Sequence, residues 1–108
     1  MLARCILEVT RLAIEVRQHR EYRRWFARLA DPRARARIDT RIRRLTLGNL
    51  GDCRAVGGGV SELRIDYGPG YRVYFAWQDS TSLVLLVGGD KSSQRHDVRT
   101  AMELARDV

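Results

Sequence analysis

The sequence predicts an α+β fold, in which an antiparallel twisted sheet packs against an N-terminal αα-hairpin in the element order β-α-α-β-β-β-(α). Two observations lead to this class. Residues 20–47 carry apolar side chains at helical spacing in two consecutive segments, whereas residues 61–87 alternate between apolar and polar side chains or run continuously apolar. A chain of 108 residues has room for one such domain and one hydrophobic core.

The N-terminal half is expected to form one strand and two helices. Leu12–Arg17 alternates weakly, which predicts a strand. Arg20–Leu29 places four large apolar side chains at positions i, i+3, i+4 and i+7, which predicts an amphipathic helix. A second helix follows over Asp31–Leu47, because a capping aspartate and Pro32 suit its start and Gly48 suits its end. The short connection between the two helices predicts an αα-hairpin.

The C-terminal half is expected to form the rest of the sheet and a last helix. Ser61–Tyr67 and Tyr71–Trp77 both alternate, and the Gly-Pro-Gly sequence at 68–70 indicates a turn between them. Leu83–Val87 is continuously apolar, as expected of a strand that is covered on both faces. Gln94–Arg106 predicts a final helix whose apolar positions 98, 102 and 105 face inward.

The predicted hairpin gathers polar side chains on one face of the sheet. A hairpin that is symmetric about Pro69 would set Asp66 opposite Arg72 and Arg64 opposite Tyr74. The face turned away from the helices would then present Glu62, Arg64, Asp66, Arg72 and Tyr74. Two arginines and a tyrosine on rigid strands can hold a phosphate and a stacked base. The alternative is a surface ion pair between Asp66 and Arg72, worth about 0.2–1 kcal/mol.

The charge of the chain points to an acidic partner. Its 20 Lys and Arg residues outnumber its 13 Asp and Glu residues, for a net charge of +7, and Lys91 is the only lysine. This excess favours nucleic acid, an acidic protein or an anionic surface. Four arginines share one arc of the second predicted helix, which is either a solvated face or a docking surface for phosphates or acidic groups. They are Arg33, Arg37, Arg41 and Arg44.

Two glycine-rich segments flank the remaining candidates. The Gly-Gly-Gly run at 57–59 is not followed by the Gly-Lys-Ser/Thr of a phosphate loop and is interpreted as a hairpin turn. Gly88-Gly89 ends the apolar strand with a sharp backbone turn, which brings Lys91 near the sheet edge as a point charge for a phosphate. The imidazole of His96 could donate or accept a proton, or His96 could be a solvent-exposed helix residue.

The sequence also indicates a compartment. It contains no apolar run long enough to span a bilayer, and Met1–Leu7 lacks the features of a signal peptide. Cys5 and Cys53 lack the spacing of metal ligands and are expected to be reduced thiols. We therefore expect a cytoplasmic protein.

Six short segments carry a family resemblance. They are Ile14–Arg17, Trp25–Leu29, Leu47–Asp52, Ser61–Ile65, Gly68–Phe75 and Gly88–Ser92. Together they resemble the addiction-module killer proteins of the RelE/ParE superfamily, most closely the HigB-like group. The most specific part is Gly-Pro-Gly-Tyr-Arg-Val-Tyr-Phe followed by Gly-Gly-Asp-Lys-Ser. The resemblance covers about Leu12–Ala105, so that Met1–Arg11 would be an N-terminal extension of one toxin domain over residues 1–108.

The resemblance implies the toxin of a type II toxin–antitoxin pair. RelE-type members cleave mRNA in the ribosomal A site, where a 2′-hydroxyl attacks the adjacent phosphate without a metal or other cofactor. Carried over by position, Arg64 and Arg72 would neutralise the scissile phosphate and Lys91 would assist them. His96 would serve as acid or base, because the late tyrosine of RelE has no counterpart in this chain. The expected RNA-contacting residues are Arg54, Tyr74 and Arg95.

The resemblance also implies partners and leaves two alternatives open. The expected partner is a cognate antitoxin, a HigA-like helix-turn-helix protein that forms a hetero-oligomer with the toxin, and mRNA on the ribosome is the expected target. No membrane association is expected. ParE-type members instead inhibit DNA gyrase without cutting anything. A plain nucleic-acid-binding module would show salt-sensitive RNA binding without toxicity.

Overall fold

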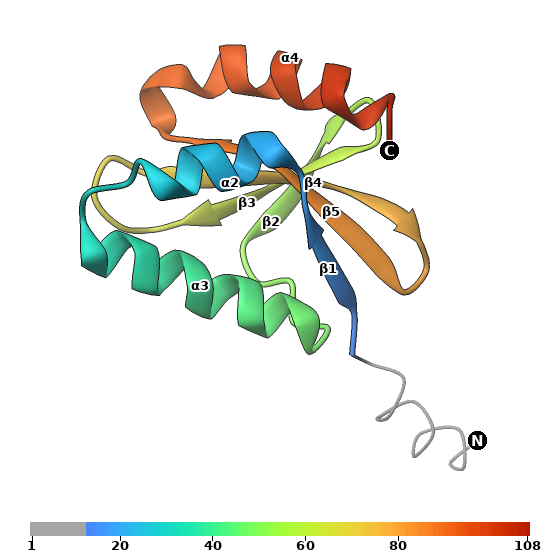
Figure 1. Cartoon of the computed structure of the whole chain (residues 1–108), viewed down its shortest axis with the longest axis horizontal. Coiled ribbons are helices and arrows are strands. Elements are labelled where there is room, and N and C mark those ends of the chain that lie inside the picture. Colours follow the sequence, from blue (N-terminus) through green and yellow to red (C-terminus); the bar gives the residue numbers. More distant parts are fainter. Residues whose placement is uncertain (1–12) are drawn as a thin grey trace.

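The structure consists of one five-stranded sheet with helices on both of its faces (Figure 1). This computed structural model describes residues 13–108, so the expected N-terminal extension and Leu12 lie outside the described residues. In chain order the elements are β1 (Glu15–Gln18), α2 (Arg20–Ala27), α3 (Pro32–Thr46), β2 (Cys53–Gly57), β3 (Val60–Ile65), β4 (Tyr71–Asp79), β5 (Ser82–Gly89), the 3-10 turn η1 (Lys91–Ser93) and α4 (Gln94–Ala105). The α+β class is therefore confirmed.

The strands lie in the order β1-β5-β4-β3-β2. Strands β2 to β5 form antiparallel neighbours, but β1 runs parallel to β5, with Val16 beside Leu83. The expectation of an antiparallel sheet is thus wrong at this edge. Alternation along a strand indicates which face each side chain takes, but it carries no information about the direction of the neighbouring strand.

Strand β2 is missing from the predicted element order. It is the edge strand next to β3, and Arg54 and Ala55 in it are both exposed, so its sequence shows no apolar face. The turn that follows agrees with the prediction. Gly57, Gly58 and Gly59 have φ values of 107°, 61° and 78° and join β2 to β3 as a hairpin. These positive φ values strain any residue that carries a Cβ, which explains the run of glycines.

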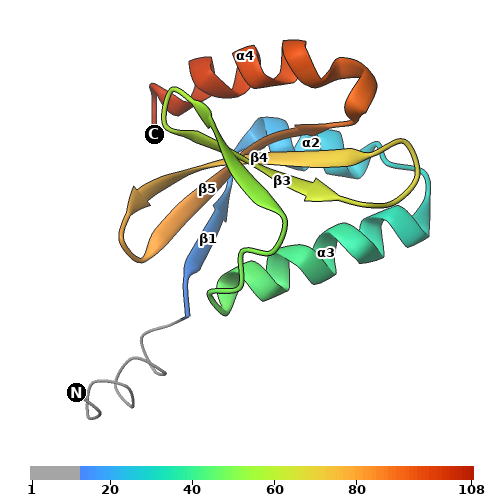
Figure 2. The same cartoon turned by 180° about the vertical axis from the view of Figure 1, so that it is seen from behind.

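The sheet is covered on both faces by separate apolar layers. α2 and α3 cover one face, where Tyr22 and Ile38 are buried with Phe75. α4 covers the other face, and α3 and α4 lie on opposite sides of the sheet in Figure 2. As expected, the apolar positions 98, 102 and 105 of α4 pack inward. α2 packs chiefly on β5 and α3 on β3, so the two helices are consecutive but a self-packed αα-hairpin is not confirmed.

The apolar layer under α4 contradicts the expectation of a solvent-facing polar surface on this side of the sheet. Glu62 and Tyr74 are fully buried beneath α4 rather than presented to solvent. The register of the hairpin also differs, because Arg64 lies directly opposite Arg72 and Glu62 lies opposite Tyr74. Asp66 falls in the connecting turn and does not face Arg72. A shift of two residues leaves every side chain on its expected face, since the side-chain period of a strand is two, but it exchanges the cross-strand partners.

Gly88 and Gly89 serve packing rather than a turn. Both lie inside β5, and neither has a positive φ value. A Cβ on Gly88 would stand 2.3 Å from the ring of Trp25 on α2, and a Cβ on Gly89 would stand 1.8 Å from Oδ2 of Asp97 on α4. Consecutive strand residues point to opposite faces, so the two glycines admit one helix on each side of the sheet.

Substitution of Gly88 by alanine should destabilise the fold by about 1–3 kcal/mol, because the new methyl group would overlap the Trp25 ring. Thermal unfolding of the two proteins measures this loss. The control repeats Gly88→Ala in a protein that also carries Trp25→Leu. In this double variant, Gly88→Ala should lower the free energy of unfolding clearly less than it does when Trp25 is present. An equal cost in both backgrounds would show that contact with the indole is not the reason for the glycine.

Candidate functional site

Glu62 lies at the centre of a buried polar cluster between β3 and α4. Its side chain is 0% exposed. Oε1 accepts from Nε of Arg54 at 3.1 Å, and Oε2 accepts from the Tyr74 hydroxyl at 3.0 Å and from the Gln94 amide at 2.8 Å. Nε of Arg72 lies 3.6 Å from Oε2. One carboxylate therefore connects β2, β3, β4 and α4.

The cluster keeps Glu62 ionised. Burial raises the pKa of Glu62, but the hydrogen bonds from Gln94, Tyr74 and Arg54 outweigh burial and hold its pKa below the ordinary value of 4.5. Burial, with the added effect of the Glu62 carboxylate, raises the pKa of Tyr74 far above its usual range. The Tyr74 hydroxyl is thus a fixed donor to Glu62, and its buried ring cannot stack on a base as the sequence-based hypothesis required.

Arg72 is held rigidly on β4. Its side chain is only 12% exposed, and Nη1 donates to the carbonyl oxygen of Gly70 at 2.6 Å. Nε is buried and has no hydrogen-bond partner in the described part of the chain, since Glu62 is beyond hydrogen-bond distance. The guanidinium is therefore positioned before any ligand arrives.

Arg64 lies directly opposite Arg72 on β3 and has its own carboxylate. Its Nη2 and Nε donate to Oδ1 of Asp52 at 2.8 and 3.2 Å. These contacts lower the pKa of Asp52, with the Arg64 hydrogen bond as the largest cause. The sequence predicted no carboxylate for Arg64, because Asp52 precedes the unpredicted strand β2. At 40% exposure Arg64 is accessible, and its ion pair with Asp52 is of the weak surface kind.

The two arginines line an open pocket of about 270 Å³, here called the Arg64–Arg72 pocket. Its lining residues are Asp52, Arg64, Ile65, Asp66, Gly70, Tyr71 and Arg72. Like charges directly opposite each other on neighbouring strands repel, so this arrangement costs stability unless carboxylates or a bound anion balance it. Lys91 is exposed close by, with its backbone nitrogen donating to Pro69 at 3.3 Å.

The other expected site residues lie elsewhere. His96 and Arg95 are exposed on α4, and neither lines the Arg64–Arg72 pocket. Arg54 and Arg95 instead line a second groove between β2 and α4. The structure thus brings Arg64 and Arg72 to one pocket, and neither Lys91 nor His96 lines it. The sequence placed Glu62 on the same sheet face as Arg72 but did not predict its burial, and it missed Asp52, because that contact depends on the path of the loop before β2.

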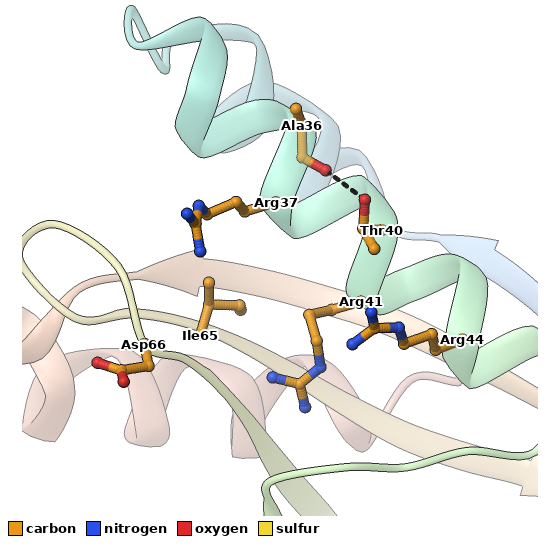
Figure 3. Close-up of a pocket in the computed structure, with 7 residues that line it drawn as sticks. All are labelled: Ala36, Arg37, Thr40, Arg41, Arg44, Ile65 and Asp66. Atoms are coloured by element: carbon orange, nitrogen blue, oxygen red, sulfur yellow. Dashed lines mark hydrogen bonds between the residues drawn. The ribbon is translucent and has the colours of Figure 1, made fainter.

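The arginine arc of α3 has a mixed role. Arg37, Arg41 and Arg44 line a pocket of about 310 Å³ over the end of β3 (Figure 3). Arg41 donates to the backbone carbonyls of Arg64 and Leu50, so it ties α3 to the loop before β2. The guanidinium of Arg37 stacks over the Tyr67 ring at 4.7 Å. Two of these arginines therefore have structural contacts, and sequence alone could not separate them from the rest.

Within residues 13–108, no three His, Cys, Asp or Glu side chains are grouped so that they could hold a metal ion. None of the helices in the same range is long and apolar enough to cross a membrane.

The fold and the site define a small basic α+β protein with paired arginines at an open pocket. Residues 24–107 match the model of the family described as Phage derived protein Gp49-like (DUF891). The chain belongs to this family, which is a toxin-like family of the broader RelE/ParE-type toxin–antitoxin group. It is also 42% identical over 97 residues to an uncharacterized protein of Haemophilus influenzae (strain ATCC 51907 / DSM 11121 / KW20 / Rd), covering 90% of this chain and 98% of that protein. Family membership indicates a toxin with an antitoxin as its partner.

Proposed function

We propose that this protein is a ribosome-dependent mRNA endoribonuclease of the HigB-like kind, which arrests translation as the toxin of a type II pair. The observation that carries the proposal is the pair formed by Arg64 and Arg72, which lie directly opposite each other at one open pocket. A phosphodiester gains negative charge as a 2′-oxygen attacks it, and two fixed guanidinium groups stabilise that charge.

In the proposed reaction the 2′-oxygen forms a bond to phosphorus and the bond from phosphorus to the 5′-oxygen breaks. The 2′-hydroxyl loses a proton and the 5′-oxygen gains one, which leaves a 2′,3′-cyclic phosphate. Arg72 is the fixed phosphate ligand, because Gly70 and Glu62 hold it in place. Arg64 is the mobile ligand, since it can exchange Asp52 for the phosphate.

The remaining roles follow from exposure. Tyr71 lines the pocket and is only partly buried, with its ring packed edge-on against Trp25, and we assign to it the base contact that the buried Tyr74 cannot make. Lys91 and His96 are exposed beyond the pocket, on η1 and on the first turn of α4. They reach the substrate only where the RNA continues from the pocket toward η1. Of these two, Lys91 assists phosphate binding and His96 is the candidate for proton transfer.

End mapping of mRNA in a translating extract tests the proposal. Added protein should create new 5′ ends inside messages that are being translated, and it should create none when ribosomes are omitted. Expression of the same protein in cells should arrest their growth. Arrested growth with intact messages contradicts the proposal.

A non-enzymatic toxin that inhibits DNA gyrase is the second candidate. This candidate is favoured by the lack of a clear proton-transfer residue at the Arg64–Arg72 pocket. The Tyr74 hydroxyl donates to Glu62, and His96 does not line the pocket. A supercoiling assay with purified gyrase separates the two functions. Inhibition of supercoiling by this protein, with messages left intact, would establish the second candidate.

A HigA-like helix-turn-helix protein encoded beside the toxin gene is the antitoxin that we propose as partner. Its co-expression should restore growth, and the two chains should purify as one complex. Because the toxin is strongly basic, an acidic antitoxin segment fits its surface.

A further inference from the structure

A second groove lies apart from the Arg64–Arg72 pocket, between the edge strand β2 and helix α4. It has a volume of about 620 Å³. Its lining residues are Arg54, Ala55, Val56, Gln94, Arg95, Val98, Arg99 and Met102. Figure 2 shows the β2–β3 hairpin reaching toward the C-terminal end of α4, where a Cβ on Gly58 would stand 2.9 Å from Cγ of Met102. We call this feature the β2–α4 groove.

The rim of the β2–α4 groove is positively charged. Arg54, Arg95 and Arg99 are exposed, and no acidic residue lines the groove. Arg54 donates only through Nε to Glu62, and its side chain is 55% exposed, so the rest of the guanidinium is accessible. Within residues 13–108, neither Arg95 nor Arg99 forms an ion pair. Three arginines with spare donors favour an acidic occupant.

The floor of the groove distinguishes a peptide from RNA. Val56, Val98 and Met102 are partly buried aliphatic or thioether side chains that form part of the layer under α4. No aromatic ring lines the groove, so a base has nothing to stack on, whereas aliphatic side chains of a peptide would gain burial. The groove therefore differs in kind from the Arg64–Arg72 pocket, where Tyr71 is present.

The backbone of β2 offers a further recognition element. β2 is the last strand of the sheet, so one edge of its main chain has no neighbouring strand among the described residues. An exposed strand edge accepts an added peptide strand through main-chain hydrogen bonds. The groove thus combines a free edge, an apolar floor and a basic rim on one side of the sheet.

We propose that the β2–α4 groove binds an acidic segment of the antitoxin that also carries aliphatic side chains. The inference rests on the toxin role in the proposed function, but not on RNA cleavage. It reassigns Arg54 and Arg95 from RNA contacts to the antitoxin interface and adds Arg99. Because this groove and the Arg64–Arg72 pocket have no lining residue in common, antitoxin binding and toxicity are separable by mutation.

The test uses the full chain and the neighbouring-gene product that restores growth on co-expression. The double variant Arg95→Glu/Arg99→Glu reverses two charges on the rim and should weaken antitoxin binding by about tenfold or more in a calorimetric titration. It should also stay toxic and escape neutralisation, because the Arg64–Arg72 pocket is intact. Arg95 lies in the first turn of α4, where glutamate suits the helix dipole, so folding should be preserved.

The matched control is Arg20→Glu/Arg28→Glu, which makes the same change of charge at the two ends of α2 on the opposite face of the sheet. It should bind antitoxin as the unchanged protein does. Equal weakening by both variants would overturn the groove as the specific site, and unchanged binding by the α4 variant would do the same. If the α4 variant instead loses mRNA cleavage and keeps its antitoxin affinity, the groove binds RNA.

The groove proposal and the proposed RNA cleavage can fail independently of each other, and different experiments detect the two failures. End mapping with the unchanged toxin decides whether RNA is cleaved, whatever the antitoxin does. Failure of every neighbouring-gene product to bind or neutralise the chain would overturn the groove proposal together with the antitoxin partner, even where mRNA cleavage is observed.

Discussion

Replacement of Arg72 by alanine is expected to reduce mRNA cleavage by about 100-fold or more while the protein stays folded. Arg72 supplies the fixed positive charge at the Arg64–Arg72 pocket, because its guanidinium is held by the carbonyl oxygen of Gly70. The fold should persist because Glu62 keeps three donors, which are Arg54, Tyr74 and Gln94. The rate of new 5′ ends in a translating extract measures the loss, and thermal unfolding monitors the fold.

Two further variants sharpen this test. Arg72→Lys keeps the charge but loses the fork that reaches Gly70 and faces Glu62, so cleavage should remain strongly reduced. Arg20→Ala on α2 removes an exposed arginine that does not line the pocket, and this variant should cleave as the unchanged protein does. Full cleavage by Arg72→Ala would rule out its role at the scissile phosphate, whatever the other residues do.

Substitution of Glu62 by alanine is expected to give the largest loss of stability, about 3–5 kcal/mol. Its carboxylate accepts three hydrogen bonds in a fully buried position and lies beside Arg72. Removal leaves the Tyr74 hydroxyl buried without an acceptor and takes away the carboxylate that lies 3.6 Å from the Arg72 Nε. In a domain of this size, each kcal/mol lowers Tm by roughly 4–8 °C, so calorimetry should record a large drop.

The same residue gives a pH dependence of known sign. The folded state holds the pKa of Glu62 below its ordinary value of 4.5. Its contribution to stability is therefore present above that value and is lost as the pH falls through the lowered folded-state pKa. Glu62→Gln should lack the pH-dependent part of the free energy of unfolding that the ionised Glu62 contributes. The difference in free energy of unfolding between this variant and the unchanged protein should therefore become smaller as the solution is acidified.

An exposed glutamate provides the control for both measurements. Glu103→Ala on α4 removes a solvent-exposed carboxylate and should change Tm little at any pH. A Glu62→Ala protein as stable as the Glu103→Ala protein would refute the structural role of the buried cluster. Such a result would also remove the reason for the rigid placement of Arg72.

Much of the fold could be predicted because its signals are local. Asp31 caps α3 by accepting from the backbone of Arg33 at 2.9 Å, and Pro32 follows as the first helical residue. Gly48 lies just beyond the end of α3 with a φ of 86°. Capping and left-handed turns depend on residues within a few positions of each other, so the sequence itself contains the information.

The elements and contacts that the sequence did not predict share one physical cause. Strand β2 is exposed at an edge, so the burial that produces alternation does not act on Arg54 and Ala55. The parallel pairing of β1 depends on β5, more than sixty residues away in the chain, and the docking of α4 depends on strands that precede it in the sequence. Tyr74 was assigned to a solvent-facing surface because the sequence predicts a last helix but not the face of the sheet that this helix covers.

What the sequence alone determined is the class of fold, the basic charge and the placement of Arg64 and Arg72 on one face of two neighbouring strands. These follow from periodicity and turn residues, which act over short stretches of chain. Only the tertiary structure decided that Asp52 balances Arg64, that Glu62 is buried beside Arg72, and that Arg54 and Arg95 belong to a different groove. The physical reason is that register and layer packing decide which charges meet, and both are set by contacts between segments distant in sequence.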